Sequence, residues 1–176
     1  MKFSINKELE NNDVLLIVIP SDKYHKFSSD IIKRLAEQPV CYVTLNQTAE
    51  ALKEEFKKHK VKSSNTIILD GITKTFREDP EESQSVYYMS SPSAFTEISL
   101  TVSKFIKFGF QYLVFDNITN LIVYSGSTQI SKFVSNLMTK TKSEKIKSVF
   151  YALDIKEHEG LIKQCESFVD KVIKLK

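Results

Sequence analysis

Short apolar runs alternate with amphipathic stretches from one end of this chain to the other. The run Val14–Ile19 is continuous and rich in β-branched residues, which is typical of a strand buried on both faces of a parallel sheet. Runs of the same kind predict about six strands, at Val14–Ile19, Val40–Leu45, Thr66–Leu69, Tyr112–Phe115, Val149–Leu153 and Val172–Leu175. The segment Val86–Met89 is a candidate for a further short strand.

The stretches between these runs have helical periodicity. The clearest example places Ile130, Phe133, Val134, Leu137 and Met138 at spacings i, i+3, i+4, i+7 and i+8, which gathers them on one helical face. The pattern predicts further helices at Phe27–Glu37, after a Thr48 cap, from Ser91-Pro92 to Gly109, and around Glu159–Phe168. Residues 74–84 are charged and interrupted by proline, which indicates an exposed loop.

This alternation predicts the α/β class, as a three-layer α/β/α sandwich with a mostly parallel sheet. The chain has 176 residues and no evident linker or repeat, so we expect a single domain over residues 1–176. Hydrophobic residues make up 41% and charged residues 27%, which excludes a disordered composition. The two cysteines, Cys41 and Cys165, have no metal-ligand spacing and are expected to be free thiols.

Charge and hydropathy limit the partners that the chain is expected to have. The net charge of +3 is mild, and the basic stretch Lys53–Lys62 is interpreted as a solvated helix face that runs into a loop, so nucleic acid is not the expected partner. The longest apolar runs have about six residues, whereas a bilayer span needs about 20, so we expect no membrane contact and a cytoplasmic location.

In an open parallel sheet, ligands bind at the carboxyl ends of the strands. After Val14–Ile19 the chain continues with Lys23 and Lys26, which could meet an anion near a helix N-terminus. A phosphate-binding loop needs glycines, and this segment has none, while Tyr24 and Phe27 add bulk there. A polar turn with solvated lysines is therefore the favoured interpretation.

Carboxylates follow three other predicted strands, as Asp70, Asp116 and Asp154. Asp116 ends an apolar run in the way that enzymes of the phosphate-loop class present a carboxylate to Mg²⁺, although aspartate is as common there as a cap or turn former. No arrangement typical of nucleophilic or zinc catalysis is evident, and the three histidines are interpreted as surface or turn residues.

The stretch Tyr112–Tyr124, with Asp116-Asn-Ile-Thr119 at its centre, resembles the Walker B region of the KaiC branch of RecA-like ATPases. Cys41–Leu45, Ile67–Gly71 and Phe168–Leu175 resemble the second, third and closing strands of that family. The resemblance spans about residues 13–175 and implies the sheet order 3-2-4-5-1-6, with the first and fifth strands adjacent.

The departures from that family predict a protein that does not hydrolyse ATP. The phosphate-binding loop of the family would fall at Ile19–Phe27 and is absent, and Asn46-Gln47 occupies the place of the catalytic carboxylates. An amide cannot accept a proton from the attacking water. Any remaining nucleotide site would comprise five residues: Lys23, Lys26, Ser28, Asp116 and Thr119, with Asp116 as the metal position.

The resemblance leads to three functional hypotheses. The first is a degenerate pseudo-ATPase, an archaeal-type regulator or signalling protein that acts through a protein partner or through its own oligomer, without a cofactor. The second is a binder of a nucleotide or phosphometabolite, in which ATP and Mg²⁺ would bind without hydrolysis. The third is a nucleic-acid-binding module that uses Lys53–Lys62 or the loops.

Overall fold

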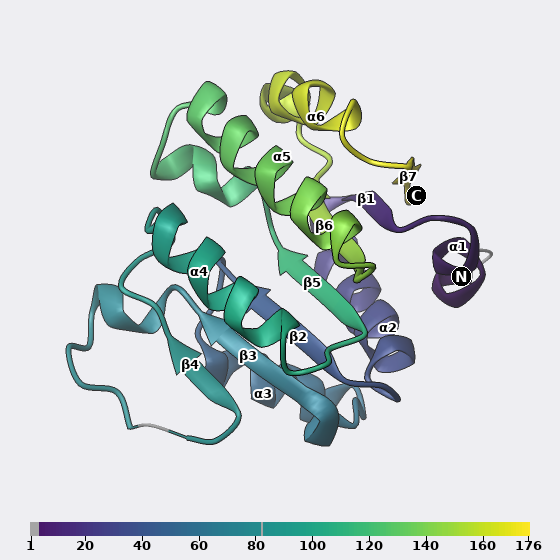
Figure 1. Cartoon of the computed structure of the whole chain (residues 1–176). Helices are drawn as coiled ribbons and strands as arrows, with labels where there is room; N and C mark the ends of the chain where they lie inside the picture. The colour runs from purple at the N-terminus through teal and green to yellow at the C-terminus, as the bar shows by residue number, and fades with distance from the viewer. Residues whose placement is uncertain (1–3, 82) are drawn as a thin grey trace.

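Seven parallel strands form one sheet with helices on both faces, as the computed structural model shows for residues 4–81 and 83–176 (Figure 1). The strands lie in the order β4-β3-β2-β5-β6-β1-β7. Their bounds are β1 Val14–Ile19, β2 Val40–Thr44, β3 Thr66–Asp70, β4 Val86–Tyr88, β5 Tyr112–Asp116, β6 Lys147–Leu153 and β7 Lys171–Lys174. The predicted α/β class is confirmed, and the order implied by the resemblance is the observed one with β4 added beside β3.

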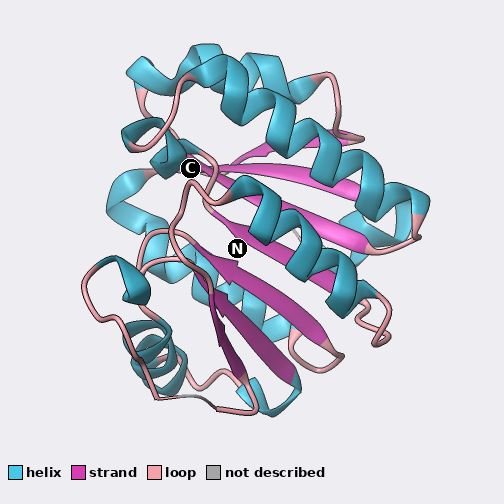
Figure 2. Ribbon diagram, turned by 60° about the vertical axis from the view of Figure 1, so that its left-hand side comes forward, coloured by secondary structure: helices cyan, strands magenta, loops and turns pink. Residues whose placement is uncertain are grey.

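The helices are divided between the two faces by the direction in which the chain moves across the sheet (Figure 2). Because crossovers between parallel strands are right-handed, connections that move toward β4 and connections that move toward β7 place their helices on opposite faces of the sheet. Thus α2 (Tyr24–Leu35) and α3 (Ala49–Lys58) lie on one face together with α1 (Ile5–Asn11), and α4 (Phe95–Ile106), α5 (Ser127–Ser143) and α6 (Glu159–Glu166) lie on the other. None of the helices in the described segments is long and apolar enough to cross a membrane.

Each face of the sheet has its own apolar core. Because side chains alternate along a strand, Leu16 and Val18 of β1 pack under α5 and α6, whereas Leu15 and Ile17 pack under α1 and α2. All six side chains of β1 are buried, as a central parallel strand requires. The predicted stripe on α5 is buried as expected, and Cys41 and Cys165 are free, buried thiols.

The helices differ from the prediction at several places. The helix α2 begins at Tyr24 rather than Phe27, directly after a 3-10 turn at Ser21–Lys23. The helix α4 begins at Phe95 rather than Ser91-Pro92, because a turn precedes it in which Ala94 N–H donates to Ser91 O. The short helix α1 was not predicted, since only Ile5 and Leu9 mark its buried side.

The helix α3 has the one predicted cap that can be tested directly. Thr48 Oγ1 accepts a hydrogen bond from Ala51 N–H at 3.1 Å, which satisfies a donor of the first turn. We expect Thr48→Ala to lower the free energy of unfolding by about 1 kcal/mol in urea denaturation. The matched control is Thr139→Ala on the exposed side of α5, where an equal loss would show that the cap has no special role.

Candidate functional site

Register brings three polar residues to the same level at the carboxyl edge of the sheet. Thr44 of β2 lies opposite Asp70 of β3 on one side and opposite Asp116 of β5 on the other. The two carboxylates are therefore two strands apart, a separation of about 10 Å. They do not share a site, and Asp154, which follows β6, is exposed.

Asp116 lies at the centre of a buried hydrogen-bond network. Tyr24 and Asn46 donate to its Oδ1 atom, with an Asn46 Nδ2 to Oδ1 distance of 2.9 Å, and Tyr42 donates to Oδ2 at 2.5 Å. We call these four residues the Asp116 cluster. Only 1% of Asp116 is exposed, so both carboxylate oxygens face protein donors rather than an open cleft. The next peptide bond, Asp116–Asn117, is cis.

Burial favours the protonated forms of the three ionisable residues in this cluster, Asp116, Tyr24 and Tyr42. Burial raises the pKa of Asp116 to about 6, the hydrogen bonds from Tyr24 and Tyr42 oppose that rise, and the Glu55 carboxylate adds to it. Burial, followed by the nearby Asp116 carboxyl, raises the pKa of both tyrosines well above the ordinary tyrosine value. Both hydroxyls therefore remain hydrogen-bond donors at physiological pH.

Tyr24 lies between β1 and α2, in the segment where the ATPases that the sequence resembles have their phosphate-binding loop. The segment between β1 and α2 has no glycine, and the first helical residue turns its ring inward, 5% exposed, against Tyr151 of β6. The ring centroids of Tyr24 and Tyr151 are 6.2 Å apart in an edge-on arrangement. The Tyr151 hydroxyl is buried and has no hydrogen-bond partner among the described residues.

The five residues predicted for a remaining nucleotide site are not brought together as a set. Lys23 and Lys26 are exposed, and neither side chain makes a hydrogen bond or ion pair within the described segments. Ser28 is buried and donates to Tyr24 O at 2.9 Å inside α2. Thr119 is buried, donates to Asn117 Oδ1 at 2.8 Å and accepts from Leu153 N–H at 3.0 Å. Of the five residues, Asp116 alone lies at the carboxyl end of a strand, where it is buried.

Asn46 and Gln47 join the Asp116 cluster to a second group of polar residues. Gln47 Nε2 donates to Glu55 Oε2 at 3.0 Å, and the Glu55 carboxylate also pairs with His25 and accepts from Ser29 Oγ. Glu55 lies on α3 and is 12% exposed, while His25 is 70% exposed. Neither Glu55 nor His25 was predicted as a site residue, because the two are 30 residues apart in sequence.

Asp70 has a structural role rather than a chemical one. Its carboxylate accepts from Ala49 N–H at 2.6 Å, Ile72 N–H at 2.7 Å, Thr73 N–H at 2.9 Å and Thr73 Oγ1 at 2.5 Å. These bonds tie the start of α3 to the turn after β3. Over residues 4–81 and 83–176, no group of three His, Cys, Asp or Glu side chains could hold a metal ion.

The fold is similar to that of a solved KaiC-like protein, PH0186 from the hyperthermophilic archaeon Pyrococcus horikoshii OT3, with a TM-score of 0.65. The sequence identity is 16%, and the similarity covers 93% of this chain and 70% of that chain. At this identity the similarity shows the fold alone: a parallel α/β sheet with flanking helices, like that of the KaiC-like protein.

The chain belongs to a family of unknown function, DUF7090, whose model matches residues 8–176. No curated protein matches the sequence.

Proposed function

We propose that this chain is a non-catalytic RecA/KaiC-like domain that acts in regulation or signalling through association with a protein. The observation that carries the proposal is the state of Asp116, whose two carboxylate oxygens accept hydrogen bonds from Tyr24, Tyr42 and Asn46 in a buried setting. Mg²⁺ binds carboxylate oxygens directly or through water and keeps several waters of its own. A metal ion at Asp116 would have to displace the protein donors and admit that water.

Two further features support the absence of hydrolysis. The residues after β2, where a catalytic carboxylate would lie, are the amides Asn46 and Gln47, and both donate to carboxylates. An amide cannot serve as a general base for the attacking water. The Tyr24 ring also lies where a phosphate would need backbone N–H groups and open space. Phosphate binding, metal binding and proton abstraction are therefore each disfavoured by a different residue.

A nucleic-acid-binding function is the alternative that a specific hollow favours. Lys33 and Arg34 of α2 meet Lys60 and Lys62 around a hollow of about 390 Å³. Asp30 and Glu37 line the same hollow, and the C-terminal end of α2, with its partial negative charge, lies beside it. The local charge is thus mixed, which is why association with a protein is preferred.

The proposal predicts that ATP leaves the thermal stability unchanged. A ligand at 100 times its Kd stabilises a protein by about 2.7 kcal/mol, which a melting curve detects easily. We expect no shift in melting temperature with millimolar ATP and Mg²⁺, and no phosphate release above the buffer rate. A clear shift without phosphate release would favour the nucleotide-binding hypothesis instead.

A shift that disappears in Lys23→Ala/Lys26→Ala would locate the nucleotide at the start of α2. The matched control for that variant is Lys163→Ala/Lys156→Ala, which removes two exposed lysines near α6. Phosphate release that depends on Asp116 would overturn the non-catalytic proposal altogether.

A further inference from the structure

The positive charge of the chain is concentrated on one face of the sheet. Residues 91–146, which include α4 and α5, contain six lysines and three carboxyl groups, so their net charge of +3 equals that of the whole chain. One of the three, Asp116, is buried, and another, Glu97 at the start of α4, accepts hydrogen bonds from the N–H and the hydroxyl of Ser90. The surface of α4 and α5 is therefore basic, and it attracts a partner with negative charge.

Most of these lysines lie at one end of the two helices. The rings of Phe95 and Phe133 stack with their centroids 4.4 Å apart, so the first residue of α4 lies beside the first half of α5. The two helices run in the same direction (Figure 1), and residues an equal number of positions further on lie at about the same level. Lys107 is thus level with Lys145, at the end of both helices.

The lysines at this end have few partners of opposite charge. Lys142 pairs with Asp170, whereas four others make no ion pair or side-chain hydrogen bond within the described segments. We call these four the lysine cluster: Lys104, Lys107, Lys140 and Lys145. Glu144 is an exposed carboxylate among them, and the carboxylates of α6 lie beyond α5 (Figure 1). The cluster therefore keeps a surplus of positive charge that a partner can neutralise.

Two exposed apolar side chains adjoin the lysine cluster. Phe108, in the turn after α4, is 71% exposed, and its ring centroid is 6.0 Å from that of Phe105. Leu100 is 67% exposed and lies one turn before Lys104 on the same side of α4. Aromatic side chains are enriched where proteins contact one another. The surface therefore offers apolar contacts as well as charge.

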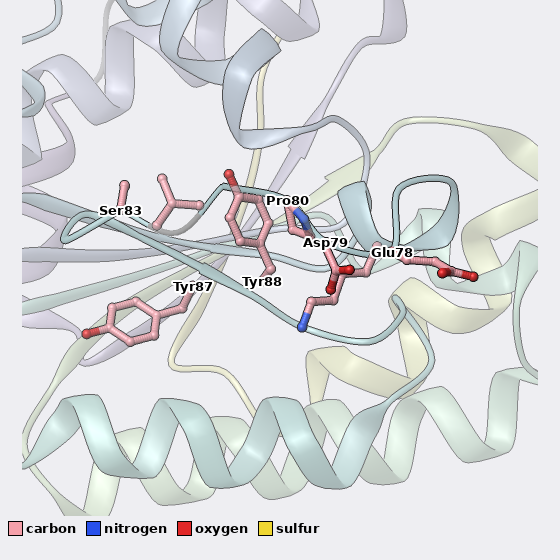
Figure 3. Close-up of a pocket in the computed structure, with 8 residues that line it drawn as sticks. Glu78, Asp79, Pro80, Ser83, Tyr87 and Tyr88 are labelled. Carbon is pink, nitrogen blue, oxygen red and sulfur yellow. The ribbon is translucent and has the colours of Figure 1, made fainter.

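The carboxylates of the loop before β4 are on the far side of Tyr87. Glu78 and Asp79 line a hollow of about 310 Å³ together with Lys74, which gives the hollow a mixed charge. Figure 3 shows Glu78 and Asp79 away from Tyr87, whose ring packs edge-on against Phe105 of α4. Tyr87 thus separates the charges of the hollow from the apolar surface of α4.

We propose that the lysine cluster, with Phe108 and Leu100, binds an acidic segment of a partner protein that also contributes an apolar side chain. Carboxylates of the segment would pair with the lysines, and its apolar side chain would lie against Phe108. Glu144 disfavours a nucleic-acid backbone, in which every unit is negative, whereas a protein segment can place a neutral residue opposite it. This inference rests on the proposed function, because it names the surface and the partner chemistry of the association.

The probe is a short, end-capped peptide of Glu and Leu, titrated into the full chain at low salt. We expect it to bind and its Kd to rise with added salt. A peptide with Lys in place of Glu should not bind. A peptide with Ser in place of Leu should bind about tenfold more weakly, because it lacks the apolar contact. Equal binding of the Leu and Ser peptides would overturn the proposal.

The decisive variant is Lys104→Glu/Lys107→Glu, which reverses two exposed charges at the end of α4. We expect its Kd for the Glu/Leu peptide to rise about tenfold. The matched control, Lys57→Glu/Lys58→Glu, makes the same charge change in the last turn of α3 on the opposite face and should keep the Kd within about twofold. Equal weakening in both variants would reduce the binding to general electrostatics and contradict the proposal.

Phe108→Ser tests the apolar contact. We expect its Kd for the Glu/Leu peptide to rise about tenfold, while its Kd for the Glu/Ser peptide stays within about twofold of the wild-type value. The matched control is Phe76→Ser, which removes a ring of similar exposure, 69%, and should change neither Kd. The proposal fails if the two variants bind the Glu/Leu peptide equally well.

Lys145→Gly tests the cluster at a position that favours glycine. Lys145 has a φ of 58°, and its N–H donates to Lys142 O while Ile146 N–H donates to Thr141 O, a helix ending that usually has glycine there. We expect a higher melting temperature, because glycine relieves the strain, and a Kd about threefold higher. Lys60→Gly, at a φ of 56° after α3, should melt higher without a change in Kd. Equal Kd values for the two variants would count against the proposal.

Three other occupants would overturn the proposal. Duplex DNA or phosphatidylserine vesicles that bind more tightly than the peptide, and release Lys104→Glu/Lys107→Glu, would show a nucleic-acid or membrane surface. A larger assembly of the wild-type chain in light scattering that dissociates in the same variant would show a second copy. The ATP experiment is independent: ATP turnover would overturn the proposed function and leave the peptide result standing, and failed peptide binding would remove only this surface.

Discussion

Asp116→Asn is expected to stabilise the protein at pH 7.5 by about 3 kcal/mol and to leave its stability near pH 4 almost unchanged. In the folded chain burial holds the pKa of Asp116 at about 6, above the ordinary value of 3.8. The folded state therefore binds the proton more tightly than the unfolded chain does. Stability from this group is fully present below pH 4 and is lost as the pH rises to about 6.

An asparagine side chain has nearly the shape of a protonated aspartic acid and, like it, one acceptor oxygen and a donor, but it does not titrate. Its oxygen can accept from Tyr24 and Asn46, as Oδ1 of Asp116 does, and its amide can donate to the Tyr42 oxygen. The measurement is urea unfolding of both proteins from pH 4 to pH 8, because all other ionisable groups are the same in the two proteins. A variant that is less stable than the wild type at pH 7.5 would show that the ionised carboxylate holds the cluster together.

Tyr24→Ala is expected to lower the free energy of unfolding by about 3 to 5 kcal/mol. The ring is 5% exposed and packs on Tyr151, so its removal leaves a cavity beside Asp116 as well as a missing donor. Tyr24→Phe keeps the ring and removes only the hydroxyl, and we expect a loss of about 2 kcal/mol at pH 8. This loss should shrink at pH 4, where Asp116 is protonated and needs the donor less.

Chemical denaturation of both variants separates packing from hydrogen bonding. The matched control is Tyr124→Phe, which removes a hydroxyl from a ring that is 45% exposed and should change stability by less than about 0.5 kcal/mol. If Tyr24→Phe behaves like Tyr124→Phe at pH 8, the Tyr24 hydroxyl contributes nothing to the ionised cluster. ATP should remain without effect on Tyr24→Ala, because the segment still lacks a glycine loop.

The sheet could be predicted from sequence because its signal is local. Val14–Ile19 is apolar at every position, and a strand buried on both faces requires that pattern. The strand β4 gave a weaker signal, since an edge strand of three residues has one exposed tyrosine and one half-buried tyrosine. The order of strands came from the family resemblance, because periodicity does not encode which strands are neighbours.

The candidate site could be predicted only in part. The place of Asp116 after an apolar run marks it as a candidate, whereas Tyr24 stands out in the sequence only by its bulk in the segment after Val14–Ile19. Their contact joins residues 92 positions apart, and the contact of Tyr42 with Asp116 spans 74 positions. Such pairs depend on how β1, β2 and β5 are arranged in space. Glu55 was missed for the same reason, since in sequence it is one of many charges on an amphipathic helix.

The buried tyrosines around Asp116 also contribute to the near-ultraviolet signal of the protein. The chain has seven tyrosines and no tryptophan, so its near-ultraviolet spectrum is dominated by tyrosine. Three of the seven, Tyr24, Tyr42 and Tyr151, are buried around one carboxyl group. Immobilised rings in an asymmetric environment contribute most of the near-ultraviolet circular dichroism, which is lost when packing loosens. The near-ultraviolet circular dichroism of the protein therefore reports on side-chain packing around Asp116 without an added label.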